Sequence, residues 1–313
     1  HVYSENDLPD PFHIIRIEIR RDDVADESMM HRIARLRHLI MLNCLGDSVT
    51  DDVLASLAQC DSLCDLKLQS CVKVTESGIE ELSRTENLHA LTFFKTNVYP
   101  SWLIHIAEMK QLRNLNIYGP KLIDEDLDFL ESLPKLDQFS LEAAKITDNG
   151  VATIANLKAI EKVGLTNCSG VTQNALVFIA DNPRISEFQT EGIPLTNDGL
   201  KHLENSRLQY LRLARANLTD DCVESIKKMK QLTRIGIVFS TLSGSRLEEL
   251  SEIPNLQWLE LSFTDVGDNA LQQIAEIQSL KCLTIVETPA TISAVDNLKQ
   301  KRPDLKVHYS GRN

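Results

Sequence analysis

The chain has 313 residues, of which 42% are hydrophobic and 25% are charged, a composition typical of a folded, soluble protein. Its formal net charge of −12 disfavours nucleic acid and anionic lipid as partners, because an acidic surface repels phosphate groups. No apolar run reaches the length of about 18 residues that a membrane-spanning helix needs, so we expect no membrane insertion within this segment.

The N-terminal residues 1–13 precede the repeated part of the chain, and we expect them to form a cap or extension. The chain begins with His1 rather than Met, and its first residues do not have the pattern of a signal peptide. We therefore expect a fragment or a processed product. An earlier segment for targeting or membrane anchoring is one alternative that such a start allows.

From residue 14 onward, one apolar pattern repeats along the chain. An apolar residue is followed by others three and five positions later, as in Leu63, Leu66 and Leu68. The first positions of the pattern lie 23 to 25 residues apart. They are Ile14, Leu39, Leu63, Leu88, Leu112, Leu136, Ile160, Ile185, Leu208, Leu232, Leu256, Leu280 and Leu305. A register kept over the whole chain indicates a repeat protein.

The second half of each repeat predicts a short helix. Segments such as 146–151, with Thr147 and Asp148, recur at the same place in many repeats. Threonine is a good N-cap, and an acidic residue just after it suits the positive end of a helix. Apolar residues then follow at helical spacing, as at Val151, Ile154 and Leu157. Each repeat is thus predicted to be a strand, a turn and a helix of about two to three turns.

Neither the strand nor the helix of one repeat buries its apolar side alone, so the repeats must stack. We predict an α/β solenoid, a curved right-handed superhelix with a parallel concave sheet and convex helices. About twelve repeats cover residues 14–304, and residues 305–313 form a C-terminal edge strand and tail. We expect a monomeric array.

The pattern LxxLxL, followed by a turn such as Val49–Thr50–Asp51, resembles the leucine-rich-repeat superfamily over residues 14–309. It is similar to the cysteine-containing subtype of F-box repeat proteins and still more to repeat proteins of planctomycete-type bacteria. The resemblance implies a scaffold for protein binding. In the bacterial proteins a membrane anchor often precedes the array, so we expect a location either in the cytoplasm or in the soluble part of a membrane-anchored protein.

One column departs from the pattern of the superfamily, which often has Asn eight residues after the first position. Here Asn never occupies that column. Hydroxyl and thiol side chains there, such as Thr96 and Cys168, are able to donate the hydrogen bonds that Asn would make. Four members of the column are apolar and have no polar side-chain group at all, and we predict looser turns at these positions. They are Pro120, Ala144, Ile193 and Ala216.

The sequence contains none of the usual catalytic or nucleotide-binding motifs. The acidic run 124–128 resembles a calcium loop, but Phe129 and Lys135 stand where an EF-hand needs Gly and Glu, so the run indicates the start of a helix. The scattered histidines pair with no nucleophile. We predict no enzymatic activity and no cofactor.

The seven cysteines form no tight disulfide framework, and we interpret them as reduced core residues. Cys60, Cys64 and Cys71 lie close together in the sequence, which allows a zinc site or a Cys60–Cys64 disulfide as the less favoured alternative. Their positions in the repeat are not expected to converge. We predict no metal site.

Function in a repeat array is expected on the surface that the repeats build together. Residues two, four and six after each first position point outward on the concave side, and the seventh lies at the exit of the strand. Basic and acidic residues nearly balance in these columns, so the acidic excess lies elsewhere. Aromatic residues make up only 5% of the chain, so several of them in neighbouring outward columns, with arginines beside them, indicate a binding patch. The candidate partner-binding residues are Tyr210, Arg212, Arg234, Phe239, Trp258, Glu260 and Phe263.

Two points stay open in this prediction. Phe239 and Phe263, at the seventh position, either join the exposed patch or turn inward and pack in the core. Phe94 with Tyr118 is a second, smaller candidate.

We predict a non-enzymatic scaffold that binds an unidentified protein or peptide through its concave face. One alternative is a structural or carbohydrate-binding surface module of a membrane-anchored assembly, in which planar side chains such as Trp258 stack on sugars. Another is the repeat adaptor part of a longer chain.

Overall fold

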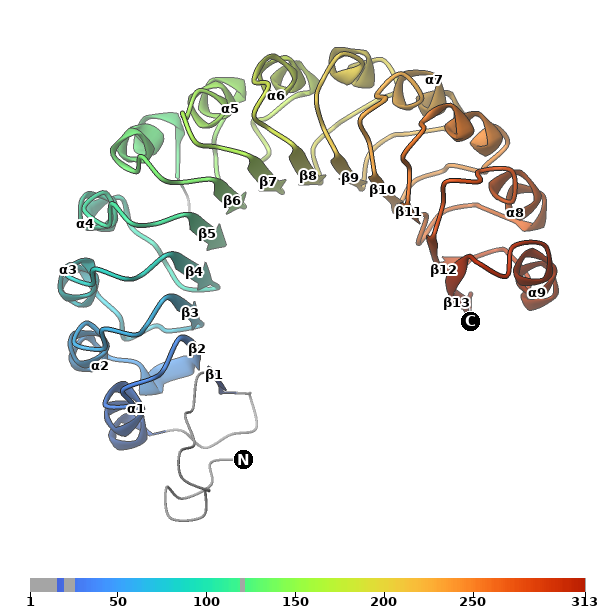
Figure 1. Cartoon of the computed structure of the whole chain (residues 1–313). Helices are drawn as coiled ribbons and strands as arrows, with labels where there is room; N and C mark the ends of the chain where they lie inside the picture. Colours follow the sequence, from blue (N-terminus) through green and yellow to red (C-terminus); the bar gives the residue numbers. More distant parts are fainter. Residues whose placement is uncertain (1–15, 20–25, 119–121, 313) are drawn as a thin grey trace, which may run out of the picture. The chain divides into compact units, whose positions relative to one another are not determined.

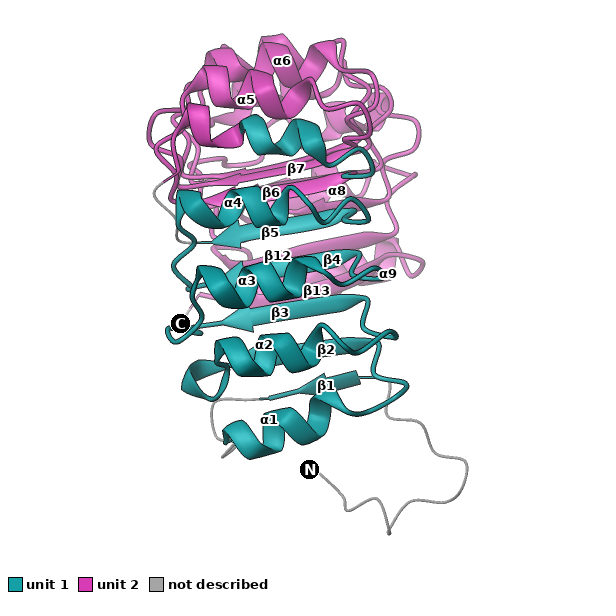
Figure 2. Ribbon diagram, turned by 90° about the vertical axis from the view of Figure 1, so that its left-hand side faces the viewer, with its two compact units in different colours: residues 1–121, 128–136 teal, residues 122–127, 137–313 magenta. Residues whose placement is uncertain are grey.

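The computed structural model describes residues 16–19, 26–118 and 122–312 of the chain (Figure 1). It contains two compact units, drawn in different colours in Figure 2. Unit 1 comprises residues 1–121 and 128–136, and unit 2 comprises residues 122–127 and 137–313. The N-terminal cap predicted at residues 1–13 lies outside the described residues.

Strands of unit 1 pair in parallel and in chain order, with a helix after each strand. The strands are β1 (Arg16–Glu18), β2 (Met41–Leu45), β3 (Asp65–Gln69), β4 (Ala90–Phe94) and β5 (Asn114–Tyr118). The helices are α1 (Glu27–Ala34), η2 (Gly46–Ser48), α2 (Asp51–Leu57), α3 (Glu76–Ser83), η3 (Pro100–Trp102) and α4 (Leu103–Ile106). The 3₁₀ helix η4 (Asp124–Ser132) has residues in both units.

Strands of unit 2 follow the same parallel order. They are β6 (Gln138–Glu142), β7 (Lys162–Thr166), β8 (Glu187–Glu191), β9 (Tyr210–Ala214), β10 (Arg234–Val238), β11 (Trp258–Glu260), β12 (Cys282–Thr288) and β13 (Lys306–Gly311). The helices are α5 (Asp148–Ala155), η5 (Gln173–Ala175), α6 (Leu176–Asp181), η6 (Gly199–Leu203), η7 (Asp220–Cys222), α7 (Val223–Ile226), η8 (Leu247–Glu252), α8 (Asp268–Ile274) and α9 (Ile292–Lys301).

Each unit has two layers, with the strands on the inner side of its arc and the helices on the outer side (Figure 1). The core lies between these layers. Apolar residues three and five after each first position are buried there, as Leu66 and Leu68 are. The largest side chains of this kind, Phe93, Phe139 and Phe188, are fully buried. The predicted α/β architecture of stacked strand–turn–helix repeats is confirmed.

Several helices differ from the predicted α-helix of two to three turns, because they are wholly or partly 3₁₀. The clearest example is η6 (Gly199–Leu203), in the short interval of 23 residues between Ile185 and Leu208. A 3₁₀ helix rises about 2.0 Å per residue against about 1.5 Å for an α-helix. Fewer residues therefore span the outer layer, which lets a shorter repeat keep the register of the sheet.

The acidic residue at the start of the helix binds the next repeat. Asp148 accepts hydrogen bonds from the backbone N–H and the hydroxyl of Thr172, both at 2.7 Å. The same Asp–Thr bridge joins other consecutive repeats within each unit: Asp51 to Thr75, Asp124 to Thr147 and Asp268 to Thr291. It also explains a glycine of the motif, because a Cβ on Gly150 would lie 2.4 Å from Oδ1 of Asp124.

Three turns of unit 2 without a donor in the eighth column are as regular as the others. These positions are Ala144, Ile193 and Ala216. Their preceding residues have the same left-handed conformation as Lys95 (φ 52°) and Asn167 (φ 51°), which precede donors. They are Ala143 (φ 58°), Gly192 (φ 72°) and Arg215 (φ 56°). The backbone N–H of each donates to the next strand, at 2.9–3.1 Å, so no side-chain donor is needed. The prediction of looser turns is therefore wrong here, and Pro120 lies outside the described residues.

The last turn of unit 2 is held by a buried arginine. The guanidinium of Arg302 donates to the carbonyl oxygens of Ile277 and Leu280, each at 2.9 Å, and to the carboxylate of Asp304. A charged group is stable in this position because all its neighbours are acceptors. Strand β13 follows directly, so Arg302 fixes the strand that ends unit 2.

No helix of the described residues is long and apolar enough to cross a membrane.

Candidate functional site

Three candidate residues lie side by side across neighbouring strands of unit 2. Tyr210 on β9 pairs in register with Arg234 on β10, which pairs with Trp258 on β11. All three occupy the second position after the first apolar residue of their repeats, and their side chains are partly or fully exposed. The regular spacing of the repeats therefore brings together residues that are 24 and 48 positions apart in the sequence.

Arg234 is held between an aromatic ring and a carboxylate. Its guanidinium carbon lies 4.4 Å from the centroid of the Tyr210 ring, and its Nη2 donates to Oε1 of Glu187 at 2.9 Å. The ammonium of Lys162 lies 3.4 Å from the same oxygen. The Tyr210 ring also contacts the Trp258 ring edge to face, with centroids 6.0 Å apart. Charged and aromatic side chains thus contact one another across neighbouring strands.

A second ion pair joins Arg212 and Glu260, whose strands lie on either side of β10. Nε of Arg212 on β9 lies 3.3 Å from Oε2 of Glu260 on β11, and Gly236 of β10 lies between them. A Cβ at Gly236 would lie 3.0 Å from Cγ of Arg212 and 3.2 Å from Oε2 of Glu260. Glycine on the middle strand therefore leaves the room that this bridge needs.

Phe239 and Phe263 stack at the exits of β10 and β11. Their ring centroids are 4.3 Å apart with 14° between the planes, and each side chain is 39% exposed. Both residues have the left-handed backbone conformation of the turn, with φ of 54° and 56°. The alternative in which these two rings pack in the core is therefore wrong.

Arg215 continues this stack one repeat earlier. Its guanidinium carbon lies 4.5 Å from the Phe239 centroid, and its Nε donates to Oε1 of Glu191 at 2.8 Å. Successive repeats thus place Glu191, Arg215, Phe239 and Phe263 in one row along the edge of the strand face.

The electrostatics of the site are balanced within unit 2. Each of the three arginines at the site is paired with a glutamate: Arg212 with Glu260, Arg215 with Glu191 and Arg234 with Glu187. Burial raises the pKa of the Tyr210 hydroxyl, so this group is neutral at physiological pH. We call the seven candidate residues the unit 2 aromatic patch: Tyr210, Arg212, Arg234, Phe239, Trp258, Glu260 and Phe263.

Small side chains form the floor between the two rows of the patch. Val238 and Ser262 occupy outward positions of the sixth column, yet they are only 2% and 4% exposed. An outward position in the repeat therefore does not by itself make a side chain accessible. The accessible surface of the patch is therefore formed by rings and ion pairs.

The smaller candidate site lies in unit 1. The Phe94 and Tyr118 rings meet edge to face, with centroids 5.7 Å apart. The ammonium groups of Lys67 and Lys95 each lie 5.4 Å from the Phe94 centroid. This site is also aromatic and cationic, but its cations are lysines.

Two solved structures are similar to most of the chain. A chain of the yeast Rad7–Elc1 complex is 16% identical, with a TM-score of 0.58, over 90% of this chain and 83% of its own length. An internalin of Listeria monocytogenes is 16% identical, with a TM-score of 0.50, over 93% of this chain and 90% of its own. Both contain leucine-rich repeats.

The chain has the leucine-rich-repeat fold. At this level of identity, the likeness extends to the fold alone. No protein-family model matches the sequence, and no curated protein matches it. The candidate sites therefore rest on the geometry of the repeats.

The cysteines of the repeats are all free thiols. Burial raises the pKa of Cys71 and Cys222 to about 12 and that of Cys168 to about 11, so these groups are protonated and poor nucleophiles. Cys60, one of the three clustered cysteines, points its thiol at the carbonyl oxygens of Leu36 and Leu39. Across the part of the chain that the structure describes, no group of three or more His, Cys, Asp or Glu is placed to hold a metal ion.

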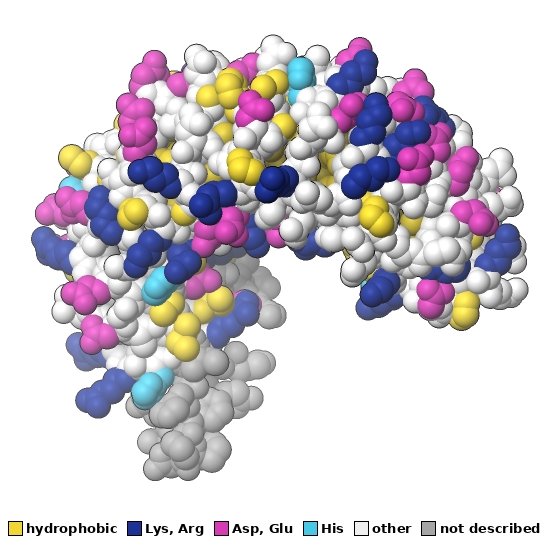
Figure 3. Space-filling view, turned by 45° about the horizontal axis from the view of Figure 1, so that its top comes forward, with side chains coloured by type: hydrophobic (Ala, Val, Ile, Leu, Met, Phe, Trp, Pro, Cys, Tyr) yellow, Lys and Arg dark blue, Asp and Glu magenta, His cyan; other side chains and the backbone are white. Residues whose placement is uncertain are grey.

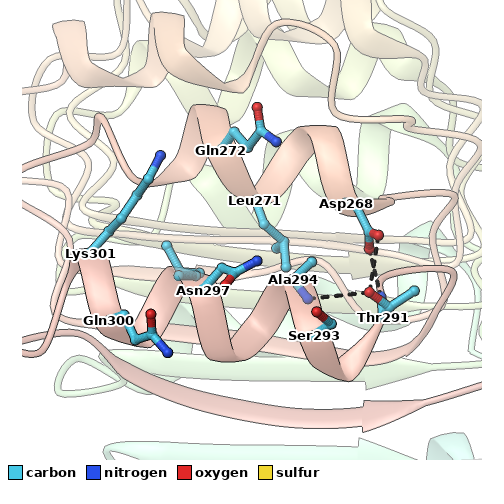
Figure 4. Close-up of a pocket in the computed structure, with 10 residues that line it drawn as sticks. Asp268, Leu271, Gln272, Thr291, Ser293, Ala294, Asn297, Gln300 and Lys301 are labelled. Carbon is cyan, nitrogen blue, oxygen red and sulfur yellow. Dashed lines mark hydrogen bonds between the residues drawn. The ribbon is translucent and has the colours of Figure 1, made fainter.

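A groove of about 450 Å³ lies between the repeat helices α8 and α9 (Figure 4). Asp268, at one end of the groove, is already bonded to Thr291 as an Asp–Thr bridge. The remaining lining residues labelled in Figure 4 are mainly amides, a hydroxyl and Lys301. The groove is on the helix layer and contains none of the candidate residues.

The helix-bearing side of the repeats carries acidic and basic side chains that alternate over short distances (Figure 3). In unit 2, Lys227 pairs with Glu224 and Glu249, and Arg246 pairs with the same two carboxylates. These pairs join the helices of neighbouring repeats. They lower the pKa of Glu249 to about 2, chiefly through the hydrogen bond from Arg246. This arrangement stabilises the helix layer and offers few unpaired charges to a partner.

Sequence reasoning placed the arginines beside the rings but did not count two of their partners, Glu187 and Glu191, among the candidate residues. Each was in an outward column of the repeat, and that signal was sufficient to place them on the strand face. Their pairing was not predictable, because a long side chain reaches neighbours one or two strands away on either side.

Proposed function

We propose that the chain is a non-enzymatic scaffold that binds a protein or peptide through the unit 2 aromatic patch. The observation that supports this is the pre-arranged set of four partly exposed rings in three consecutive repeats, with paired arginines beside them: Tyr210, Phe239, Trp258 and Phe263. Tyrosine, tryptophan and arginine dominate the binding energy of protein interfaces.

The patch is rigid before any partner arrives, which favours tight binding. Arg234 is held by Glu187 and the Tyr210 ring, and Arg212 is held by Glu260. A side chain that is already ordered loses little conformational entropy when it enters an interface. Because the arginines carry their own counter-ions, the preferred partner segment is apolar or neutral rather than strongly charged.

A protein or peptide fits the ring geometry better than a carbohydrate. Sugar stacking needs an open aromatic face, but the Arg234 guanidinium covers a face of Tyr210. Phe239 lies in the row between Arg215 and Phe263, each of which covers one of its faces. The exposed edges of these rings suit the irregular contacts of a polypeptide.

The test is selection of binders from a random displayed-peptide library, followed by affinity measurement on variants. We expect the Trp258→Ala, Arg234→Ala double variant to bind the selected peptides at least about tenfold more weakly, as for a residue pair at the centre of an interface. Its melting temperature is expected to change little, because both side chains are on the surface. Binding is followed by the fluorescence anisotropy of the labelled peptides, a signal that does not depend on Trp258 and so compares the variant with the wild type directly.

Phe178→Ala is the matched control, since Phe178 on α6 is 36% exposed but belongs to the helix layer of the same unit. It should leave the affinity unchanged. Equal affinity of the double variant and the wild type would overturn the placement of the site. A glycan array run in parallel tests the carbohydrate alternative, which would replace our proposal if a glycan bound in a Trp258-dependent way and no peptide did.

A further inference from the structure

We infer that the strand face of unit 1 carries a separate binding site for an acidic segment of a protein partner. The site consists of Lys67 on β3, Phe94 on β4 and Lys95 in the turn that follows β4. We call it the unit 1 lysine pair. It shares no residue with the unit 2 aromatic patch, so it does not depend on the function proposed for that patch.

The geometry places two ammonium groups around one ring. Nζ of Lys67 and Nζ of Lys95 each lie 5.4 Å from the Phe94 centroid, within the range of a cation–π contact. The ring itself is supported by the edge-to-face contact with Tyr118 on β5. Both lysines therefore point to the same place on the strand face, although they come from neighbouring repeats.

Among the described residues, neither lysine forms a salt bridge within the chain. Asp65 is the single carboxylate in the outward positions of β2 to β5, two residues before Lys67 on the same strand. Two cations that converge on one ring repel each other unless an anion lies between them. Among the described residues no salt bridge neutralises the two ammonium groups that converge on Phe94, and an external carboxylate would do so.

An acidic polypeptide fits this site better than a nucleic acid. Two lysines are able to bind one or two carboxylates, whereas a phosphate backbone gains its affinity from many contacts along its length. Thr92 and Asn114 lie on β4 and β5 near Phe94, in partly exposed outward positions, and the buried Asn116 donates to both of them. The Thr92 hydroxyl and the Asn114 amide are suited to the backbone of a bound peptide.

The experiment measures the fluorescence anisotropy of labelled hexaglutamate and hexaglutamine peptides with the full chain at low salt. We expect hexaglutamate to bind and hexaglutamine not to bind. Each of Lys67→Gln and Lys95→Gln should weaken hexaglutamate binding by about two- to fivefold, as for an exposed ion pair, and the double variant by about tenfold. Salt at about 0.5 M should abolish the binding, because exposed charges are then screened.

Lys73→Gln is the matched control, because Lys73 is an exposed lysine of unit 1 outside the strands. It makes the same change of charge and should leave the affinity as it is. Trp258→Ala should also leave it unchanged, and this separates a failure here from a failure of the unit 2 proposal. Circular dichroism melting confirms that each variant is folded.

Several results would overturn the inference. The inference is wrong if hexaglutamate does not bind at about 1 mM. It is also wrong if Lys73→Gln loses as much affinity for hexaglutamate as the Lys67→Gln, Lys95→Gln double variant. Inorganic phosphate that displaces the peptide as efficiently as unlabelled hexaglutamate would indicate a site for free anions. A labelled hexathymidylate that binds as tightly as hexaglutamate, with the same dependence on Lys67 and Lys95, would indicate a nucleic-acid site.

Discussion

The strand faces of the two units have the same backbone plan, but they differ in whether their basic side chains form salt bridges. In unit 2, Arg212 and Arg234 are each paired with a glutamate, and Arg234 also packs on the Tyr210 ring. In unit 1, Lys67 and Lys95 share one ring and form no salt bridge among the described residues. One face is thus internally neutralised, and the other keeps charge available for a ligand.

This difference follows from the chemistry of the two cations. The planar guanidinium of arginine stacks on a ring and still donates to a carboxylate, as Arg234 does between Tyr210 and Glu187. An ammonium group is a compact point charge on a flexible stem, which binds whichever anion approaches. A repeat array therefore obtains two different binding surfaces from one backbone by the choice of residues in its outward columns.

The largest effect is expected from the Asp–Thr bridges, which the two units have in common. Asp51→Ala in unit 1 and Asp148→Ala in unit 2 should each lower the free energy of unfolding by about 2 kcal/mol, because two hydrogen bonds to a carboxylate are lost. Urea titration measures this. The Asp148→Asn variant should lose much less, since Asn197 makes the same bridge to Thr219. If only one unit responds, the units do not share this source of stability.

The second-largest effect is expected to differ between the strand faces of the two units. Glu260→Ala should lower the free energy of unfolding by about 1 kcal/mol, because Arg212 is then left partly buried without its counter-ion. Lys67→Gln in unit 1 should change the free energy of unfolding by less than about 0.5 kcal/mol, as expected for a partly exposed side chain without a salt bridge. Urea titrations of the two variants, side by side, give the comparison. Equal losses would mean that the two faces do not differ in their internal pairing.

The smallest effect concerns the pH dependence of unit 1. Burial raises the pKa of Asp65, and Arg16 and Lys67 offset this only in part. A carboxyl group whose pKa is higher in the folded state binds its proton more tightly there, so its ionisation above the unfolded pKa of about 3.9 costs stability. Asp65→Asn should therefore stabilise the chain at pH 7 by about 0.5 kcal/mol or less.

This gain should disappear as the pH falls toward about 3, where the wild-type carboxyl is protonated in both states. Urea titrations at pH 7 and at low pH give the two differences. A destabilised Asp65→Asn variant at pH 7 would show that Asp65 is instead a stabilising partner of Lys67, and the lysine pair would then be internally neutralised like the arginines of unit 2.

The strand positions, the buried leucines and the outward columns followed directly from the spacing of the repeats, because side chains alternate along a strand. The helices were less predictable. A short repeat such as the one that contains η6 (Gly199–Leu203) satisfies the same apolar spacing with a 3₁₀ helix, which the pattern does not distinguish from a short α-helix. The predicted cap is confirmed, since the Thr147 side chain accepts from the backbone N–H of Asn149 and Asp148 lies in the first turn. The pattern did not show that Asp148 also bonds to Thr172 of the next repeat.

For the site, the sequence alone determined which side chains face outward and that Tyr210, Trp258 and three arginines lie on neighbouring strands. The tertiary structure decided which of them pair, since Arg212 meets Glu260 across 48 residues of sequence and Arg234 meets Glu187 across 47. It also decided that Phe239 and Phe263 are exposed. The spacing of the repeats determines where each backbone position lies. The contacts of a side chain depend on its rotamer and on the neighbouring strands, so they form only once the strands are stacked.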